Sequence, residues 1–177
     1  TRRASDLACR TLVPAGQVVM LPAWETLPAG RLSPSAETVG ARLSALRALK
    51  EWDGSAPIVL IASVRAALQP VADNLLSVEP IRLSEGQRGV SLDDIARTLV
   101  ALAYTRVDLV SRRGEFAVRG GILDVVPPQS AHPVRVELFG DEVEQMRPFS
   151  VADQRSGSDP IAELLLPPSR ELLLTPE

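Results

Sequence analysis

The sequence predicts a mixed α/β protein in two parts, and two patterns carry this prediction. Over residues 1–79, apolar stretches of strand length alternate with stretches of helical periodicity, which is typical of an α/β layer. Over residues 80–150, one helical stretch precedes several short strand-like stretches separated by glycine-containing turns, which is the spacing of an antiparallel sheet. We therefore expect an α/β domain and a small α+β domain, with residues 151–177 as a tail that packs back on one of them.

The first part opens with a predicted strand at residues 17–21, followed by a proline-rich loop. Ser33 and Pro34 indicate the start of a helix, because serine caps helix N-termini and proline is favoured at the first helical position. From there apolar residues recur every three or four positions, which predicts an amphipathic helix that ends at Asp53–Gly54.

A second strand and a second helix complete the first part. The apolar run at residues 57–64 has the length of a strand that is covered on both faces in a parallel sheet. Ser63 then predicts the cap of a short helix over residues 64–76. Strand, helix, strand and helix in this order are what an α/β layer requires.

The second part is predicted to contain one long helix and a series of short strands. A strand-like IRLSEG segment starts at residue 81, and Ser91 opens a helix over residues 91–103 with acidic residues in its first turn. Glycine-containing pairs between the later strands indicate hairpin turns and an antiparallel meander. These strands are predicted at residues 106–110, 115–119, 121–126, 133–139 and 142–147.

Alternation along the predicted strands separates core side chains from a second, open face of the sheet. Phe116 lies on the core face, so Arg119 points to the open face. The same alternation places Arg135, Glu137 and Phe139 there. Arginine and aromatic side chains are enriched in protein interfaces, which makes this face a candidate docking surface. The alternative is a solvated sheet face with cross-strand arginine–glutamate pairs, which needs no partner.

The composition and the motifs exclude several classes of function. The 177 residues are 45% hydrophobic and carry a net charge of −3, so the chain as a whole does not attract nucleic acid or anionic membranes. One cysteine and one histidine leave no disulfide pair and little material for a metal site or a catalytic triad. No GxxxxGKS or GxxxxGKT loop is present, so we expect no cofactor and no catalytic, cofactor-binding or metal-binding residues. No apolar run approaches the ~20 residues of a membrane span, so a cytosolic location without a membrane partner is expected.

Five stretches of the sequence resemble one known family. They are LPAWETLP (21–28), SAETVGARLSAL (35–46), YTRVDLVSRRGEFAVRGGILDVVPP (104–128), HPVRVELFGDEVEQMRPFSVADQRS (132–156) and RELLL (170–174). Together they are similar to the N-terminal module of bacterial transcription-repair coupling factors, which is itself similar to the nucleotide-excision repair protein UvrB. The single lysine among 19 basic residues suits an actinobacterial member, and the start without methionine suits a fragment of a longer chain.

The resemblance implies how the two parts are related. Residues 1–79 look like part of a degenerate helicase-type, RecA-like α/β domain, similar to domain 1a of UvrB. Residues 80–150 look like a small α+β domain inserted in it, similar to UvrB domain 2. Residues 151–177 look like the segment that returns to the first domain, similar to domain 1b.

The resemblance also implies a non-catalytic role in transcription-coupled nucleotide-excision repair. The inserted domain of this family docks on UvrA, the damage-recognition ATPase, and recruits it to sites of stalled RNA polymerase. ATP-driven translocation on double-stranded DNA and RNA polymerase binding belong to other domains of the full-length family protein, so we expect this fragment to be a monomer and not an enzyme. The residues implied in UvrA binding are Arg119, Arg135, Phe139, Glu137 and Arg106, the last by the resemblance alone.

Departures from the UvrB pattern leave two alternatives open. UvrB has a further arginine where this chain has Ala117, and the chain lacks the Walker lysine and the tyrosine-rich hairpin of UvrB. One alternative is a DNA-binding or ATP-using fragment of a UvrB-type repair helicase, whose DNA affinity would fall steeply with salt. The other is a structural or autoinhibitory layer whose docking face is covered by another domain of the intact protein.

Overall fold

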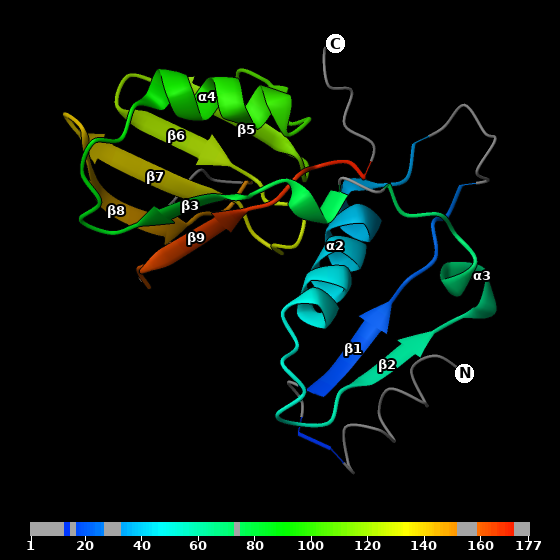
Figure 1. Cartoon of the computed structure of the whole chain (residues 1–177). Helices are drawn as coiled ribbons and strands as arrows, with labels where there is room; N and C mark the ends of the chain where they lie inside the picture. Colours follow the sequence, from blue (N-terminus) through cyan, green and yellow to red (C-terminus); the bar gives the residue numbers. More distant parts are fainter. Residues whose placement is uncertain (1–12, 15–16, 27–32, 73–74, 152–158, 172–177) are drawn as a thin grey trace.

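The computed structural model describes residues 13–14, 17–26, 33–72, 75–151 and 159–171 (Figure 1). Within these residues the strands form a parallel pair, an antiparallel pair and a five-stranded sheet. The parallel pair belongs to the first part of the sequence and the five-stranded sheet to the second, while the antiparallel pair joins residues 81–84 of the second part to residues 163–166 of the tail. The prediction of a small mixed α/β fold with an antiparallel sheet is therefore confirmed. No helix in the described ranges is long and apolar enough to cross a membrane.

The first part is a short strand–helix–strand unit. Its two strands run parallel, and the long helix packs against the first of them. Val39 and Leu43 of this helix form a small core with Leu75. The elements are β1 (Val18–Leu21), α2 (Ala36–Lys50), β2 (Val59–Ala62), α3 (Val64–Ala67) and η2 (Leu75–Ser77).

The start of α2 differs from the prediction. The cap is Ser35 and not Ser33, because Ser35 Oγ accepts a hydrogen bond of 3.2 Å from the backbone N–H of Thr38. The carboxylate of Glu25 binds the hydroxyl of Ser35 and accepts a bond of 2.8 Å from Thr38 Oγ1. A carboxylate from the preceding loop therefore helps to select the cap, which the local sequence does not reveal.

The second helix is much shorter than the predicted span of residues 64–76. Ser63 caps α3 as predicted, with a bond of 3.1 Å from the N–H of Ala66 to its hydroxyl, but the helix ends after Ala67. Pro70 explains this early end, because a proline disfavours helical backbone in the residue before it and cannot donate a helical hydrogen bond.

The second part contains one helix, the five-stranded sheet and one strand of the antiparallel pair, whose other strand comes from the tail. Neighbours from β5 to β8 are antiparallel, as predicted, and β4 runs parallel to β5. The strand predicted at residues 106–110 is reduced to the two residues of β4. The elements are β3 (Ile81–Ser84), α4 (Leu92–Ala101), β4 (Thr105–Arg106), β5 (Glu115–Arg119), β6 (Ile122–Val125), β7 (Val134–Phe139), β8 (Glu142–Pro148) and β9 (Glu163–Leu166).

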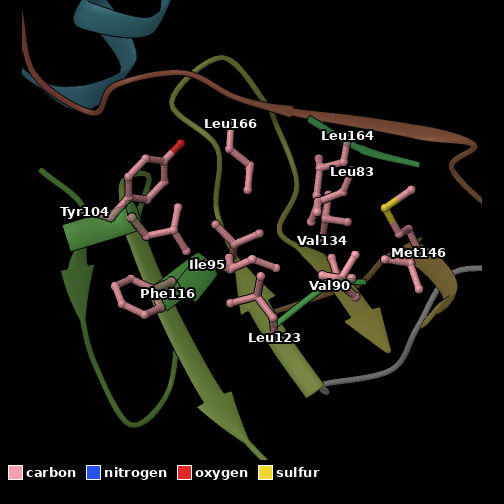
Figure 2. Close-up of a cluster of buried hydrophobic side chains, with 14 of the residues drawn as sticks. Leu83, Val90, Ile95, Tyr104, Phe116, Leu123, Val134, Met146, Leu164 and Leu166 are labelled. Atoms are coloured by element: carbon pink, nitrogen blue, oxygen red, sulfur yellow. The ribbon is translucent and has the colours of Figure 1, made fainter. Parts of the chain in front are cut away.

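One hydrophobic core fills the space between the sheet, α4 and the β3–β9 pair (Figure 2). Ser91 caps α4 as predicted, because its hydroxyl accepts a bond of 3.3 Å from the N–H of Asp94. β9 belongs to the tail of the sequence, so the tail completes the core of the second part. Core side chains from these elements include Leu83, Ile95, Phe116, Leu123 and Leu166.

The two parts also touch through α2. Arg42 Nε donates a hydrogen bond of 2.6 Å to Glu171, which follows β9, and Trp24 Nε1 donates one of 2.9 Å to the same oxygen. Gly40 lies against the backbone of Pro128, since a Cβ at that glycine would come within 2.5 Å of the proline carbonyl carbon. The predicted domain boundaries stay a prediction, and the structure adds that the tail contacts both parts.

Candidate protein-docking site

The face of the five-stranded sheet that points away from α4 carries four of the five predicted docking residues. Side chains directly opposite one another in a sheet share a face. Asp124 of β6 lies opposite Arg135 of β7, and Ile122 lies opposite both Arg119 and Glu137. We call this surface the outer face; its members are Ala117, Arg119, Ile122, Asp124, Arg135, Glu137, Phe139, Glu142, Gln145 and Arg147.

Asp124, at the centre of the outer face, binds two of the predicted arginines. Arg135 donates hydrogen bonds from Nε to Oδ1 at 2.7 Å and from Nη2 to Oδ2 at 2.8 Å. Arg119 donates from Nη2 to Oδ2 at 2.8 Å. The side chain of Asp124 is 1% exposed, that of Arg135 is 17% exposed and that of Arg119 is 52% exposed. The hydrogen bonds to Asp124 raise the pKa of the Arg135 guanidinium, although burial acts in the opposite direction.

A second, small core covers part of the outer face, which the sequence predicted to be the open side of the sheet. Val110, Ala117, Val126 and Phe149 form this buried cluster. The Arg135 guanidinium carbon lies 4.8 Å from the centre of the Phe149 ring, within the range of a cation–π contact. The cover forms because the chain after β4 leaves the sheet and brings Val110 into the cluster instead of continuing as a strand.

Phe139 is the most exposed large hydrophobic residue of the outer face, at 79%. It is the last residue of β7 and precedes Gly140, whose φ of +64° is a conformation that glycine adopts without strain. Glu137, two residues earlier on the same strand, is half-buried and accepts a bond of 3.0 Å from Gln145. The ring is solvated and contributes little to the packing of this chain, so it is available as an interface anchor.

Arg106 lies apart from the other four predicted residues. It is exposed on β4 at the edge of the sheet, opposite Phe116, whose side chain belongs to the core on the α4 side. It lines an open hollow of about 470 Å³ together with Asp108 and Arg119, and a second hollow next to Arg97 of α4. The structure therefore groups four predicted residues on one face and leaves Arg106 at the boundary between that face and the helix.

Asp124 and Phe149 are not among the site residues that the sequence predicts. A signal for Asp124 was present, because alternation with Leu123 and Val125 puts this acid on the face of the two arginines. Phe149 follows the last residue of β8, and its burial depends on how the chain turns there, which strand alternation does not specify.

The outer face offers recognition chemistry. Arginine donors match the geometry of carboxylates, and an exposed ring can be buried in a partner's pocket. In the part of the chain that the structure describes, no group of three or more His, Cys, Asp or Glu side chains could hold a metal ion.

Comparison with known proteins identifies the family. The model of the UvrB interaction domain matches residues 81–171, from β3 to the partner of Arg42. Transcription-repair-coupling factors of Mycobacterium bovis and Mycobacterium tuberculosis are 51% identical over 98% of this chain, which covers 14% of their length. Those of Bacillus subtilis and Escherichia coli are 36% and 37% identical over 90% and 85% of this chain, which covers 13% of their length. The resemblance recognised in the sequence is confirmed, and the chain belongs to the UvrB interaction domain family.

Proposed function

We propose that this chain is a non-catalytic docking module of a transcription-repair coupling factor and that its outer face binds UvrA. In this role it brings UvrA to RNA polymerase stalled on DNA. The observation that carries the proposal is the combination of an almost fully solvated Phe139 and an arginine pair held by Asp124 on one face of the matched domain. The names of the relatives, all transcription-repair-coupling factors, support the pathway.

The exposed groups suggest what the partner surface contains. Arg119 is half exposed, so its remaining donors suit carboxylates of the partner. Phe139 suits an apolar pocket, because burial of a solvated ring contributes strongly to affinity. Glu137 extends the outer face towards β8, and Arg106 lies next to this face at the sheet edge, where it shares a hollow with Arg119.

Arg135 has a different role from Arg119 in this proposal. It is largely buried and binds Asp124 through two nitrogens, so its contribution to docking is mainly to shape the surface. A loss of UvrA affinity after truncation of Arg135 would therefore mix a contact effect with a folding effect. Phe139 is the better test, since its ring makes little contact with the rest of the chain.

The test is the affinity of the purified chain for UvrA, measured by titration calorimetry. We expect Phe139→Ala to weaken binding by about 30-fold or more, the effect of losing an anchor that contributes ~2 kcal/mol. Leu68→Ala is the matched control, because Leu68 is 78% exposed but lies at the end of α3 in the first part. Equal affinities of wild type and Phe139→Ala would refute the assignment of the outer face.

The wider setting belongs to the same proposal. The parallel β1–α2–β2 unit fits a remnant of a RecA-like helicase domain into which the second part is inserted. The fragment acts without a cofactor and as a monomer in the cytosol. ATP-driven movement on double-stranded DNA and RNA polymerase binding are assigned to other domains of the longer protein.

A further inference from the structure

Asp124, the central residue of the outer face, is an acid, although the arginines around it suit a partner surface that also carries acids. We propose that Asp124 is a positioning residue, which holds the Arg119 and Arg135 side chains in the orientation that UvrA binds. This inference rests on the proposed function and adds a residue and a mechanism to it.

The geometry around Asp124 restricts both arginines. The Nε and Nη2 atoms of Arg135 bind different oxygens of the same carboxylate, at 2.7 and 2.8 Å, which fixes the plane of the guanidinium. The ring of Phe149 lies 4.8 Å from the guanidinium carbon, so Arg135 is held by both the acid and the ring. Arg119 reaches the same carboxylate with one nitrogen, at 2.8 Å, while half of its side chain stays in solvent.

This arrangement lowers the entropic cost of docking. An arginine side chain has many rotamers. Each arginine that becomes immobilised only on binding costs entropy and so lowers the affinity. On the outer face Asp124 orders Arg119 before the partner arrives. The side chain of Arg119 stays half exposed and lines the hollow that it shares with Arg106.

If Asp124 acts only through its charge, its neutralisation should change the UvrA affinity in one direction; if it positions the arginines, the affinity should change in the opposite direction. Asp124→Asn makes the outer face more positive, so charge attraction alone predicts tighter binding to an acidic partner. Positioning predicts weaker binding, because an amide cannot form the paired, charge-assisted bonds that hold the two guanidinium groups. The sign of the change therefore separates the two explanations.

The experiment measures UvrA binding by Asp124→Asn and by a matched variant, Asp53→Asn. Asp53 lies in the first part, is fully exposed and accepts a bond from the N–H of Ser55 that asparagine can also accept. We expect Asp124→Asn to weaken binding by about 5- to 150-fold, because the two arginine side chains would then have to be ordered at the moment of docking. We expect Asp53→Asn to bind like the wild type. Unchanged or tighter binding by Asp124→Asn would overturn the inference while leaving the proposed function intact.

Two further measurements separate positioning from a general loss of stability. In an Arg119→Ala background, Asp124→Asn should weaken binding by a clearly smaller factor, because one of the side chains that it positions is gone. In the free wild-type chain, nitrogen-15 relaxation should show the Nε–H of Arg119 to be more ordered than that of Arg82, an exposed arginine of β3. Equal mobility of these two groups would overturn the inference even if Asp124→Asn failed to fold. A wild-type chain that does not bind UvrA would overturn the proposed function, and with it this inference.

Discussion

Arg135→Ala is expected to destabilise the chain by about 2–4 kcal/mol, through the buried acid that it leaves behind. The variant removes two of the three hydrogen bonds from arginine to Asp124, whose side chain is 1% exposed. Breaking a buried ion pair usually costs ~3–5 kcal/mol. Two features reduce this value here: Arg119 still binds the carboxylate, and the partial exposure of Arg135 screens the interaction. The lost contact with Phe149 adds a smaller cost.

Urea unfolding followed by far-ultraviolet circular dichroism measures this cost, because neither tryptophan, Trp24 or Trp52, lies in the second part to report on it by fluorescence. Arg119→Ala is the matched control. It removes one hydrogen bond from a half-exposed side chain, and we expect it to cost about 1 kcal/mol or less. If Arg135→Ala lowered the free energy of unfolding no more than Arg119→Ala does, the prediction that Arg135 compensates the buried charge of Asp124 would be refuted.

Two other predictions concern the first part. Gly40→Ala should lower the melting temperature, although alanine favours helix by about 1 kcal/mol, because its Cβ would come within 2.5 Å of the Pro128 backbone. Glu25→Gln should weaken the acid dependence of stability. Burial raises the pKa of Glu25, but hydrogen bonds with Ser35 and Thr38 outweigh this effect and lower the pKa below its ordinary value of 4.5. A lowered pKa stabilises the folded state above the unfolded pKa, and this contribution is lost as the pH falls through the folded value.

Each of these predictions has a direct control. Ser44→Ala, at an exposed position of the same helix, should raise the melting temperature, and a Gly40→Ala variant that did the same would contradict the close contact. For Glu25, thermal melts of wild type and variant should differ most near neutral pH and converge as the pH falls below the ordinary carboxyl pKa of 4.5 and through the lowered pKa of the folded state. Parallel melting curves across this range would show that the carboxylate does not stabilise the start of α2.

Local patterns in the sequence predicted those features that depend on neighbouring residues. The cap residues Ser63 and Ser91 and the side-chain alternation of β7 are local, because a hydroxyl reaches an N–H three residues on and adjacent strand residues face opposite sides. The placement of Arg135 and Phe139 on the face away from the core followed from this alternation alone.

The features that the sequence did not predict depend on distant contacts. Glu25, more than ten residues before Thr38, folds back to the start of α2, and Val110 leaves the predicted strand to join Phe149. Asp124 is an intermediate case. The face of the sheet on which it lies was predictable, but its three hydrogen bonds come from arginines of the two neighbouring strands. The candidate site was thus located by alternation, whereas its internal connections required the fold.

The pairing of β3 with β9 has a consequence for the order in which this protein can fold. β3 begins the second part and β9 lies in the tail, yet Leu83, Leu164 and Leu166 share the core of the second part. The hairpins of the sheet are local and can form early, but the core stays open to water until β9 has been synthesised. During translation, therefore, the arginine-bearing strands emerge from the ribosome as a sheet whose apolar side is covered only in part, by α4, and the last strand completes the cover.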